Sequence, residues 1–295
     1  MLELLTWENI TEFLNSNFTS SLAGALTGAF AGAMAAQRIA DRAKQREALL
    51  AEIRSTNAAI MVAFTICNAG LALKRQFTKD IYETYTAKKA ELQEFHRRRT
   101  MGQQPADLPF EFQADFRTLQ MPVVPIDVLR TQLFEKISAP GRPLALVAAL
   151  AGSVAALADV IQRRNALIER FQKLGQEDLA QISAFYFGMP YRAGHVSTEF
   201  GDTVESLHRL NDDVIFFSEL LGNDLMAHGN RILGEYKKIA KVKEEKIHGV
   251  DFTDARTSGL MPDAVNYTDW LKGFPNAAQP GAPGDGPRPA GSVRA

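Results

Sequence analysis

The stretch SSLAGALTGAFAGAMAAQRIADRAKQR, residues 20–46, determines how the rest of the chain is interpreted. No charged residue lies between Glu12 and Arg38, and about 20 apolar residues in a helix cross the roughly 30 Å hydrocarbon core of a bilayer. Small residues recur at every fourth position, on one face of that helix, namely Gly24, Gly28, Gly32 and Ala36. Such a face lets two membrane helices approach backbone to backbone. The sequence therefore predicts a transmembrane helix over residues 18–37 that favours homo-oligomers.

The charges on either side of this segment predict its orientation. Residues 1–17 carry only acidic charges, whereas basic residues follow the segment at positions 38, 42, 44 and 46. Flanks rich in Lys and Arg stay on the cytoplasmic side of a membrane, so we expect residues 1–17 to lie outside and everything after Arg38 to lie inside. The prediction is a single-pass protein of the inner membrane, in contact with the lipid bilayer, with a cytoplasmic C-terminal domain.

Two other interpretations of the same stretch stay open. One is a cleaved secretion signal, because Ala33-Met34-Ala35 resembles a cleavage site, although the basic start of such signals is missing. The other is a buried helix of a soluble protein, because alanine and glycine make the run only moderately apolar. Each glycine inside a soluble helix costs about 1 kcal/mol, so that helix would need tight packing to explain three of them.

Residues 38–275 are predicted to form a cytoplasmic helical bundle. Apolar residues recur with steps of three and four along three long stretches, which end near Thr100, Phe171 and Tyr236. This spacing is typical of helices that pack in bundles or coiled coils, and the first stretch is expected to bend near Gly70. Alternating β-branched runs are nearly missing. The predicted fold class is therefore all-α, an antiparallel bundle of long helices that follows an N-terminal transmembrane helix.

Proline-rich segments separate the long helices. Residues 103–143 hold six of the thirteen prolines and are expected to form an irregular connection with one short helix over 126–137. Another short helix is expected over 177–185, and the last long helix over 197–243. The final residues, 276–295, offer nothing to bury and are predicted to be disordered.

A second membrane span is an alternative within the first long helix, because residues 55–73 carry no charge. Asn57 and Asn68 interrupt this run, however, and a crossing would place Arg97-Arg98-Arg99 outside the cell, against the usual distribution of charge. We expect the segment to lie in the core of the bundle.

Composition and motifs exclude several classes of function. The formal net charge of −1 argues against a nucleic-acid partner, because such binding needs a basic surface that displaces counterions. A single cysteine, Cys67, excludes an internal disulfide framework. The sequence has no phosphate-binding loop and no nucleophile elbow, so we expect a protein without enzymatic activity or cofactor.

The loop FYFGMPYRAGHVS, residues 185–197, is the most distinctive soluble segment. Loops on a rigid scaffold often carry function, and this one holds Tyr191, Arg192 and His195 as candidate functional residues. The alternative is a helix corner, in which its aromatic rings close the end of the bundle.

Metal binding and nucleophilic chemistry are weaker alternatives. Glu205 and His208 have the Glu-x-x-His spacing of metal sites in four-helix bundles, but the second such pair that those sites require is missing. Asp212 and Asp213 beside them are expected to be solvated. Cys67 lies on the apolar side of a helix, where a thiol is usually a small core residue.

Three segments together resemble a group of uncharacterised bacterial membrane-anchored proteins. They are AGAMAAQRIADR (31–42), STNAAIMVAFTICN (55–68) and FYFGMPYRAGHV (185–196). The resemblance implies a location in the bacterial inner membrane and brings no activity with it.

Three functions are consistent with these observations. The first is a non-enzymatic single-pass membrane protein, whose cytoplasmic bundle binds or senses an unknown protein partner and which self-associates through its glycine face. The second is an oligomeric membrane effector that perturbs or permeates the bilayer through the same face. The third is a metal-dependent bundle enzyme that uses Glu205 and His208.

Overall fold

The structure is a computed structural model that describes residues 17–105, 108, 110–174, 179–192, 194–240 and 245–275. Within these ranges the secondary structure is helical, with one isolated bridge between Tyr191 and His195 and no strand. The all-α prediction is therefore confirmed for the described part. The expected external segment (1–17, apart from Asn17) and the expected disordered tail (276–295) lie outside the described residues.

The chain divides into two compact units, which are described separately. One comprises Met1–Ile53 with Arg231–Glu245, and the other comprises Arg54–Asn230 with Lys246–Ala295. Two helices, α2 (Asn17–Leu73) and α7 (Glu199–Ala240), contribute residues to both units.

The first unit contains the beginning of α2 and the end of α7. Every residue from 21 to 48 is exposed. Beyond them Ile53 is buried, as are Ile232, Leu233 and Tyr236 on α7. Leu22, Leu26, Phe30 and Met34 form an apolar ridge with a spacing of four, and each is at least 43% exposed.

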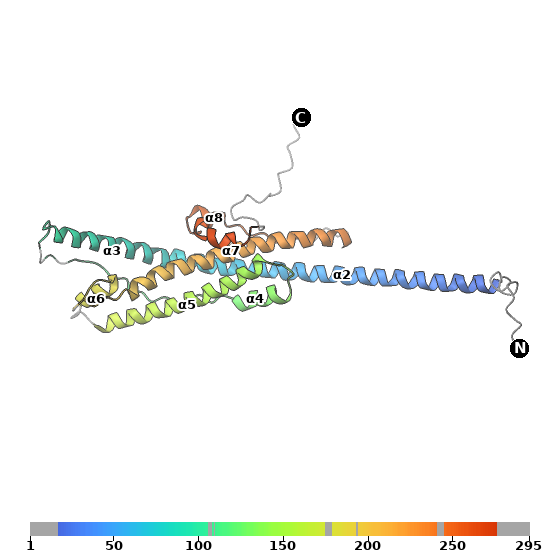
Figure 1. Cartoon of the computed structure of the whole chain (residues 1–295), viewed down its shortest axis with the longest axis horizontal. Coiled ribbons are helices and arrows are strands. Elements are labelled where there is room, and N and C mark those ends of the chain that lie inside the picture. The colour runs from blue at the N-terminus through green and yellow to red at the C-terminus, as the bar shows by residue number, and fades with distance from the viewer. Residues whose placement is uncertain are drawn as a thin grey trace, which may run out of the picture. The chain divides into compact units, whose positions relative to one another are not determined.

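In the second unit the chain stays helical from Arg54 to Thr100. After α2 come a π-helical turn, η1 (Lys74–Thr78), and α3 (Lys79–Thr100) (Figure 1). The expected bend near Gly70 is therefore replaced by a π turn four residues later. Gly70 has a different role, because a Cβ there would lie 2.9 Å from the Ile215 side chain on α7.

The remaining elements of this unit are α4 (Ile126–Glu135), α5 (Arg142–Leu174), α6 (Leu179–Phe187) and most of α7. The helices predicted over 126–137, 177–185 and 197–243 are thus present with shifted ends. Prolines restrict the residue before them and remove a backbone donor, which explains why the chain around them stays irregular.

Contacts along α7 show that it runs antiparallel to its neighbours. From Gly201 to Ile215 to Gly229, α7 meets Tyr85, Gly70 and Thr56, in reverse order along the chain. Asp224 near the end of α7 pairs with Arg142 at the start of α5, and Glu199 pairs with Arg170. Each of the three contacts between α7 and the helix from Arg54 to Thr100 involves a glycine, which lets the two helix backbones approach closely.

The core of the second unit lies between α2, α5 and α7. On α5 the buried residues follow the predicted stripe, listed here as Val147, Leu150, Val154, Leu157, Ile161, Ile168 and Phe171. Half of residues 56–73 on α2 are buried as well. The uncharged segment 55–73 therefore contributes about half of its residues to this core.

Residues 245–275 contain three short helices that the sequence did not indicate. They are α8 (Thr253–Thr257), η3 (Ala264–Tyr267) and α9 (Thr268–Lys272). The Tyr267 ring stacks on Phe216 of α7, with centroids 3.7 Å apart, and its hydroxyl donates to Asp213 at 3.0 Å. Asp213 is therefore a hydrogen-bonded, half-buried group, and the expectation that it is solvated was wrong.

Candidate functional site

The small-residue face of α2 is unoccupied in the described chain. A Cβ built on Gly24, Gly28 or Gly32 would meet nothing within 4 Å, and Ala36 is exposed. The glycine row therefore serves no packing contact among the described residues of this chain. In the second unit, by contrast, Gly70, Gly201 and Gly229 lie directly against a neighbouring side chain.

Two helices are long and apolar enough to cross a membrane, namely Ser21–Thr100 and Arg142–Leu174. The most apolar window of the first is 50% buried, and that of the second is 44% buried. Since residues 21–48 are all exposed, the first window must include residues beyond 48, in the packed part of the helix. Both windows therefore contain core residues of the bundle, and support for a membrane span from length and apolarity is weak.

A buried polar cluster lies where the π turn faces α7. Lys74 donates to the Asp212 carboxylate at 2.6 Å, and both side chains are largely buried. Asn211, fully buried, donates to the Gly70 carbonyl and to the Thr78 hydroxyl, each at 3.2 Å. The α7 side chains therefore bind two side chains of the π turn, Lys74 and Thr78, and the Gly70 carbonyl that precedes it. Asp212 is thus an ion-pair partner, and the expectation that it is solvated was wrong.

His208 belongs to the same region but not to a metal site. Its ring stacks on Tyr82, with centroids 4.1 Å apart and 7° between planes, and its Nε2 lies 3.7 Å from Asp212. Burial lowers the pKa of His208. Glu205 is exposed, and no group of three His, Cys, Asp or Glu side chains suited to a metal occurs among the described residues. The geometry does not favour the metal-dependent alternative.

Cys67 is a buried thiol, as its position on the apolar stripe predicted. Its Sγ lies 3.8 Å from the Ile215 carbonyl oxygen, and burial raises its pKa to about 12. A nucleophilic cysteine needs a lowered pKa and access to solvent. Cys67 has neither, so it is a core residue here.

The loop 185–197 divides into a buried part and an exposed part. Tyr186 and Phe187 are buried among aromatic rings, as the helix-corner interpretation predicts. The candidate residues form a tight surface turn, in which the Tyr191 N–H donates to the His195 carbonyl at 2.8 Å. Arg192 has a φ of 20° in this turn. His195 lines a cavity of about 90 Å³, which is too small for a typical ligand.

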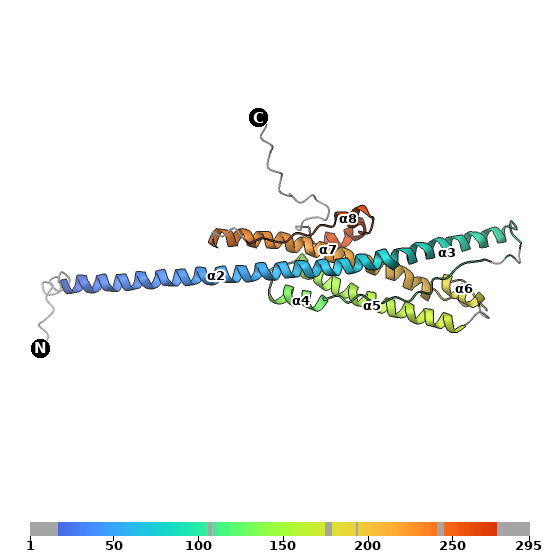
Figure 2. The same ribbon diagram turned by 180° about the vertical axis from the view of Figure 1, so that it is seen from behind.

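Between α3 and α4 an extended segment runs back beside α5 (Figure 2). Two side chains of α5 hold it in place. The Asn165 amide accepts from the Leu119 N–H at 3.0 Å and donates to the Leu119 carbonyl at 2.7 Å. The guanidinium of Arg164, buried beside it, donates to the Arg117 carbonyl at 2.6 Å. These bonds satisfy backbone groups that have no helix or sheet partner, and they fix the segment against α5.

The fixed segment carries an aromatic wall. Phe110, Phe112, Ala114 and Phe116 alternate with more polar residues and pack against the core. Phe112 lies 4.7 Å from Phe187 of α6, and Phe110 lies 5.4 Å from Phe95 of α3, measured between ring centroids. This alternation is the period-two pattern of an extended chain with one buried face. The sequence letters FEFQADF carried that signal, which the sequence analysis missed.

The wall, the end of α3 and α6 enclose a groove of about 1110 Å³. Its lining is mainly apolar, with Leu92, Phe95, Leu108, Phe110, Phe112, Ala114, Phe116, Leu179, Ala180, Ile182, Ala184, Met189 and Pro190. The charged and titratable side chains in the lining are His96, Arg99 and Glu111. An apolar concave site with a few polar groups is the usual form of a ligand site.

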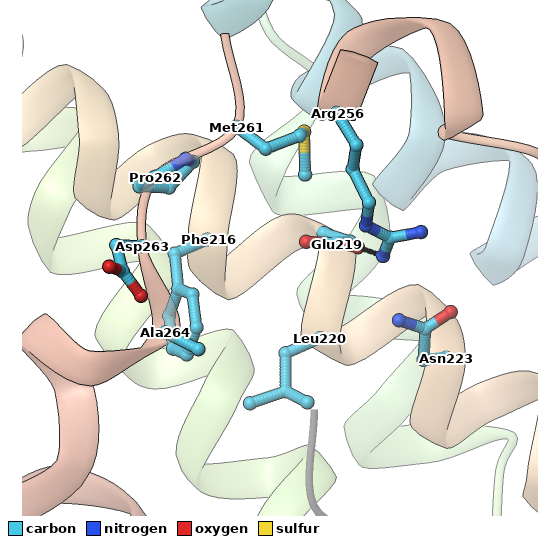
Figure 3. A pocket seen from close by; sticks show the side chains of 9 residues that line it. All are labelled: Phe216, Glu219, Leu220, Asn223, Arg256, Met261, Pro262, Asp263 and Ala264. Atoms are coloured by element: carbon cyan, nitrogen blue, oxygen red, sulfur yellow. Dashed lines mark hydrogen bonds and ion pairs between the residues drawn. The ribbon is translucent and has the colours of Figure 1, made fainter. Parts of the chain in front are cut away.

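A second, smaller pocket of about 300 Å³ lies between α7 and the C-terminal segment (Figure 3). Arg256 reaches across it to form an ion pair with Glu219 of α7. Burial raises the pKa of Glu219, and the Asp263 carboxylate accepts from the Val265 N–H as a helix cap. The charges of this pocket already have partners within the chain, so it offers a ligand less than the groove does.

No known protein family, curated protein or solved structure matches this chain.

Proposed function

We propose that this chain is a non-enzymatic single-pass membrane protein, anchored by residues 18–37, whose cytoplasmic helical bundle binds a protein partner. The observation that carries the proposal is the difference between the two units. Apolar side chains of the second unit are packed into a core, whereas Leu26 and Phe30 of α2 are 63% and 69% exposed on an uncharged helical segment. An exposed apolar helix is stable where lipid surrounds it.

The charge distribution supports the orientation. Residues 38, 42, 44 and 46 are basic and follow the segment directly, and such clusters stay on the cytoplasmic side. The bundle would then lie in the cytoplasm of a bacterial cell, at the inner membrane.

Cell fractionation with fusion reporters tests the topology. Reporters are placed after Arg46 and after Thr100, at the two ends of the helical region beyond the anchor. Membrane association with both reporters in the cytoplasm is expected. A protein found entirely in the soluble fraction would overturn the anchor, and a reporter exposed outside after Thr100 would make residues 55–73 a second span.

A second function, an oligomeric membrane effector, is favoured by one observation. The unoccupied face of Gly24, Gly28 and Gly32 leaves room for another copy to approach closely. Gly28→Leu should abolish self-association in a membrane, whereas Phe30→Leu, on a different face, should leave it intact. If the chain is only a membrane-anchored binding protein, Gly28→Leu abolishes self-association and has no effect on ion leakage. If the chain is an effector, the wild type makes vesicles leak ions, and Gly28→Leu abolishes both self-association and this leakage.

A further inference from the structure

The groove between α3, α6 and the aromatic wall has the shape and size of a site for a small amphiphilic ligand. Its volume of about 1110 Å³ slightly exceeds the roughly 300–1,000 Å³ found for small-molecule sites. One wall is held at its C-terminal end, because Arg164 donates to the carbonyls of Asp115 and Arg117 and Asn165 binds the backbone of Leu119. The other wall is the end of α3, with Leu92 and Phe95.

The three arginines near the end of α3 differ in whether they form an ion pair. Three arginines end α3, and two of them, Arg97 and Arg98, are bound by the carboxylate of Glu94 at 2.6 and 2.8 Å. Arg99 lines the groove and has no ion-pair partner among the described residues. His96 lies beside it in the lining, and Glu111 is the acidic residue of the lining. Among the described residues, the groove therefore offers one guanidinium without an ion-pair partner in a mainly apolar lining.

We propose that the groove binds a long-chain fatty acid, with the hydrocarbon chain against the aromatic wall and the carboxylate on Arg99. A single anion at the end of an apolar chain complements a mainly apolar lining that holds one guanidinium without an ion-pair partner among the described residues. Guanidinium binds carboxylate through paired hydrogen bonds, and each methylene group removed from water adds to the affinity. The site is independent of the anchor, since every residue in it belongs to the second unit.

The test is photo-labelling of the full chain with a palmitate analogue that carries a diazirine near the end of its chain. The protein is held in phosphatidylcholine nanodiscs, or in buffer if fractionation finds it soluble. Labelled peptides are identified by mass spectrometry. We expect label on peptides that contain residues 92–116 and 179–190, and competition by oleate but not by methyl oleate.

Two pairs of variants separate the groove from other surfaces. Ala180 is exposed and lines the groove, so Ala180→Trp fills it, whereas Ala87→Trp places the same ring on an exposed part of α3 outside the groove. Ala180→Trp should lower the labelling about tenfold or more, and Ala87→Trp should not change it. Arg99→Gln should lower it about fivefold, the value of one exposed ion pair of roughly 1 kcal/mol, and Arg98→Gln should leave it unchanged.

Several results would overturn the proposal. Label confined to residues 18–37 would mean that the analogue only marks lipid-exposed helix. Equal labelling of wild type and Ala180→Trp would exclude the groove as the binding site. Equal competition by oleate and its methyl ester would exclude recognition of the carboxylate. Cross-linking of the groove to a second copy or to another polypeptide would make it a protein-docking surface instead.

Discussion

The buried ion pair between α5 and α7 provides the sharpest test of what holds this bundle together. Arg142 donates from two nitrogens to the Asp224 carboxylate, at 2.8 and 2.6 Å, and the two side chains are only 3% and 12% exposed. Asp224→Ala leaves the guanidinium buried without its charge partner, and breaking a buried pair in this way costs about 3–5 kcal/mol. That loss is a large part of the roughly 5–15 kcal/mol by which a typical domain is stable.

The measurement is equilibrium unfolding of the full chain in urea, in a nonionic detergent, followed by far-ultraviolet circular dichroism. Arg163→Ala is the control, because Arg163 pairs with Asp159 on the same helix at 3.0 Å but both side chains are more than half exposed. An exposed pair contributes about 1 kcal/mol at most. The double variant Arg142→Met, Asp224→Leu should recover most of the lost stability, since apolar replacements of both partners restore packing. A cost for Asp224→Ala no larger than that for Arg163→Ala would refute the reasoning.

Three further outcomes follow from close contacts and burial. Gly201→Ala should destabilise the chain by about 1–3 kcal/mol in the same unfolding assay, because its Cβ would collide with the Tyr85 hydroxyl oxygen. Gly222→Ala, with nothing within 4 Å, should be neutral or stabilising, and equal effects of the two variants would contradict the close approach. Burial raises the pKa of the Cys67 thiol to about 12, so a thiol reagent at about pH 8.5, where a free thiol is half ionised, should modify the chain only after unfolding. By linkage, the stability that the protonated thiol contributes is present below pH 9.0 and is lost as the pH rises toward 12, and rapid modification of the folded chain would disprove the burial. Asn57→Ala removes two hydrogen bonds to the segment that follows α7. The backbone amide of His248, which donates to Asn57, should therefore exchange its hydrogen with solvent about two- to tenfold faster. An unchanged exchange rate would show that these bonds do not hold the segment.

The helices and their buried stripes were predictable because helical packing leaves a local signal. Residues three and four apart fall on the same face of a helix, so the apolar stripe of α5 can be found without knowing what covers it. The π turn of the first long helix was not predicted, since the bend was expected near Gly70. Between Leu71 and Thr78 the apolar spacing is interrupted at Lys74, which the structure buries against Asp212 at the π turn.

The groove could be predicted only in part. The alternating letters of residues 110–116 indicate an extended segment with an aromatic face, and this signal is local. Which helices that face meets is not local. The contacts from Phe112 to Phe187 and from Phe110 to Phe95 depend on the segment folding back along α5, and the periodicity of either segment says nothing about that path.

The polar contacts explain why the path is specific although the sequence does not reveal it. Asn57 and Asn165 interrupt apolar helices and look like weaknesses in the pattern, yet each amide both donates to and accepts from the backbone of an irregular segment. Their partners lie up to 191 residues away along the chain. Apolar burial is non-directional and tolerates many arrangements, whereas an amide that satisfies an N–H and a carbonyl fixes one register. In this bundle the apolar stripes therefore stabilise the helices, and the few polar residues among them determine where the connecting segments, and with them the groove, are placed.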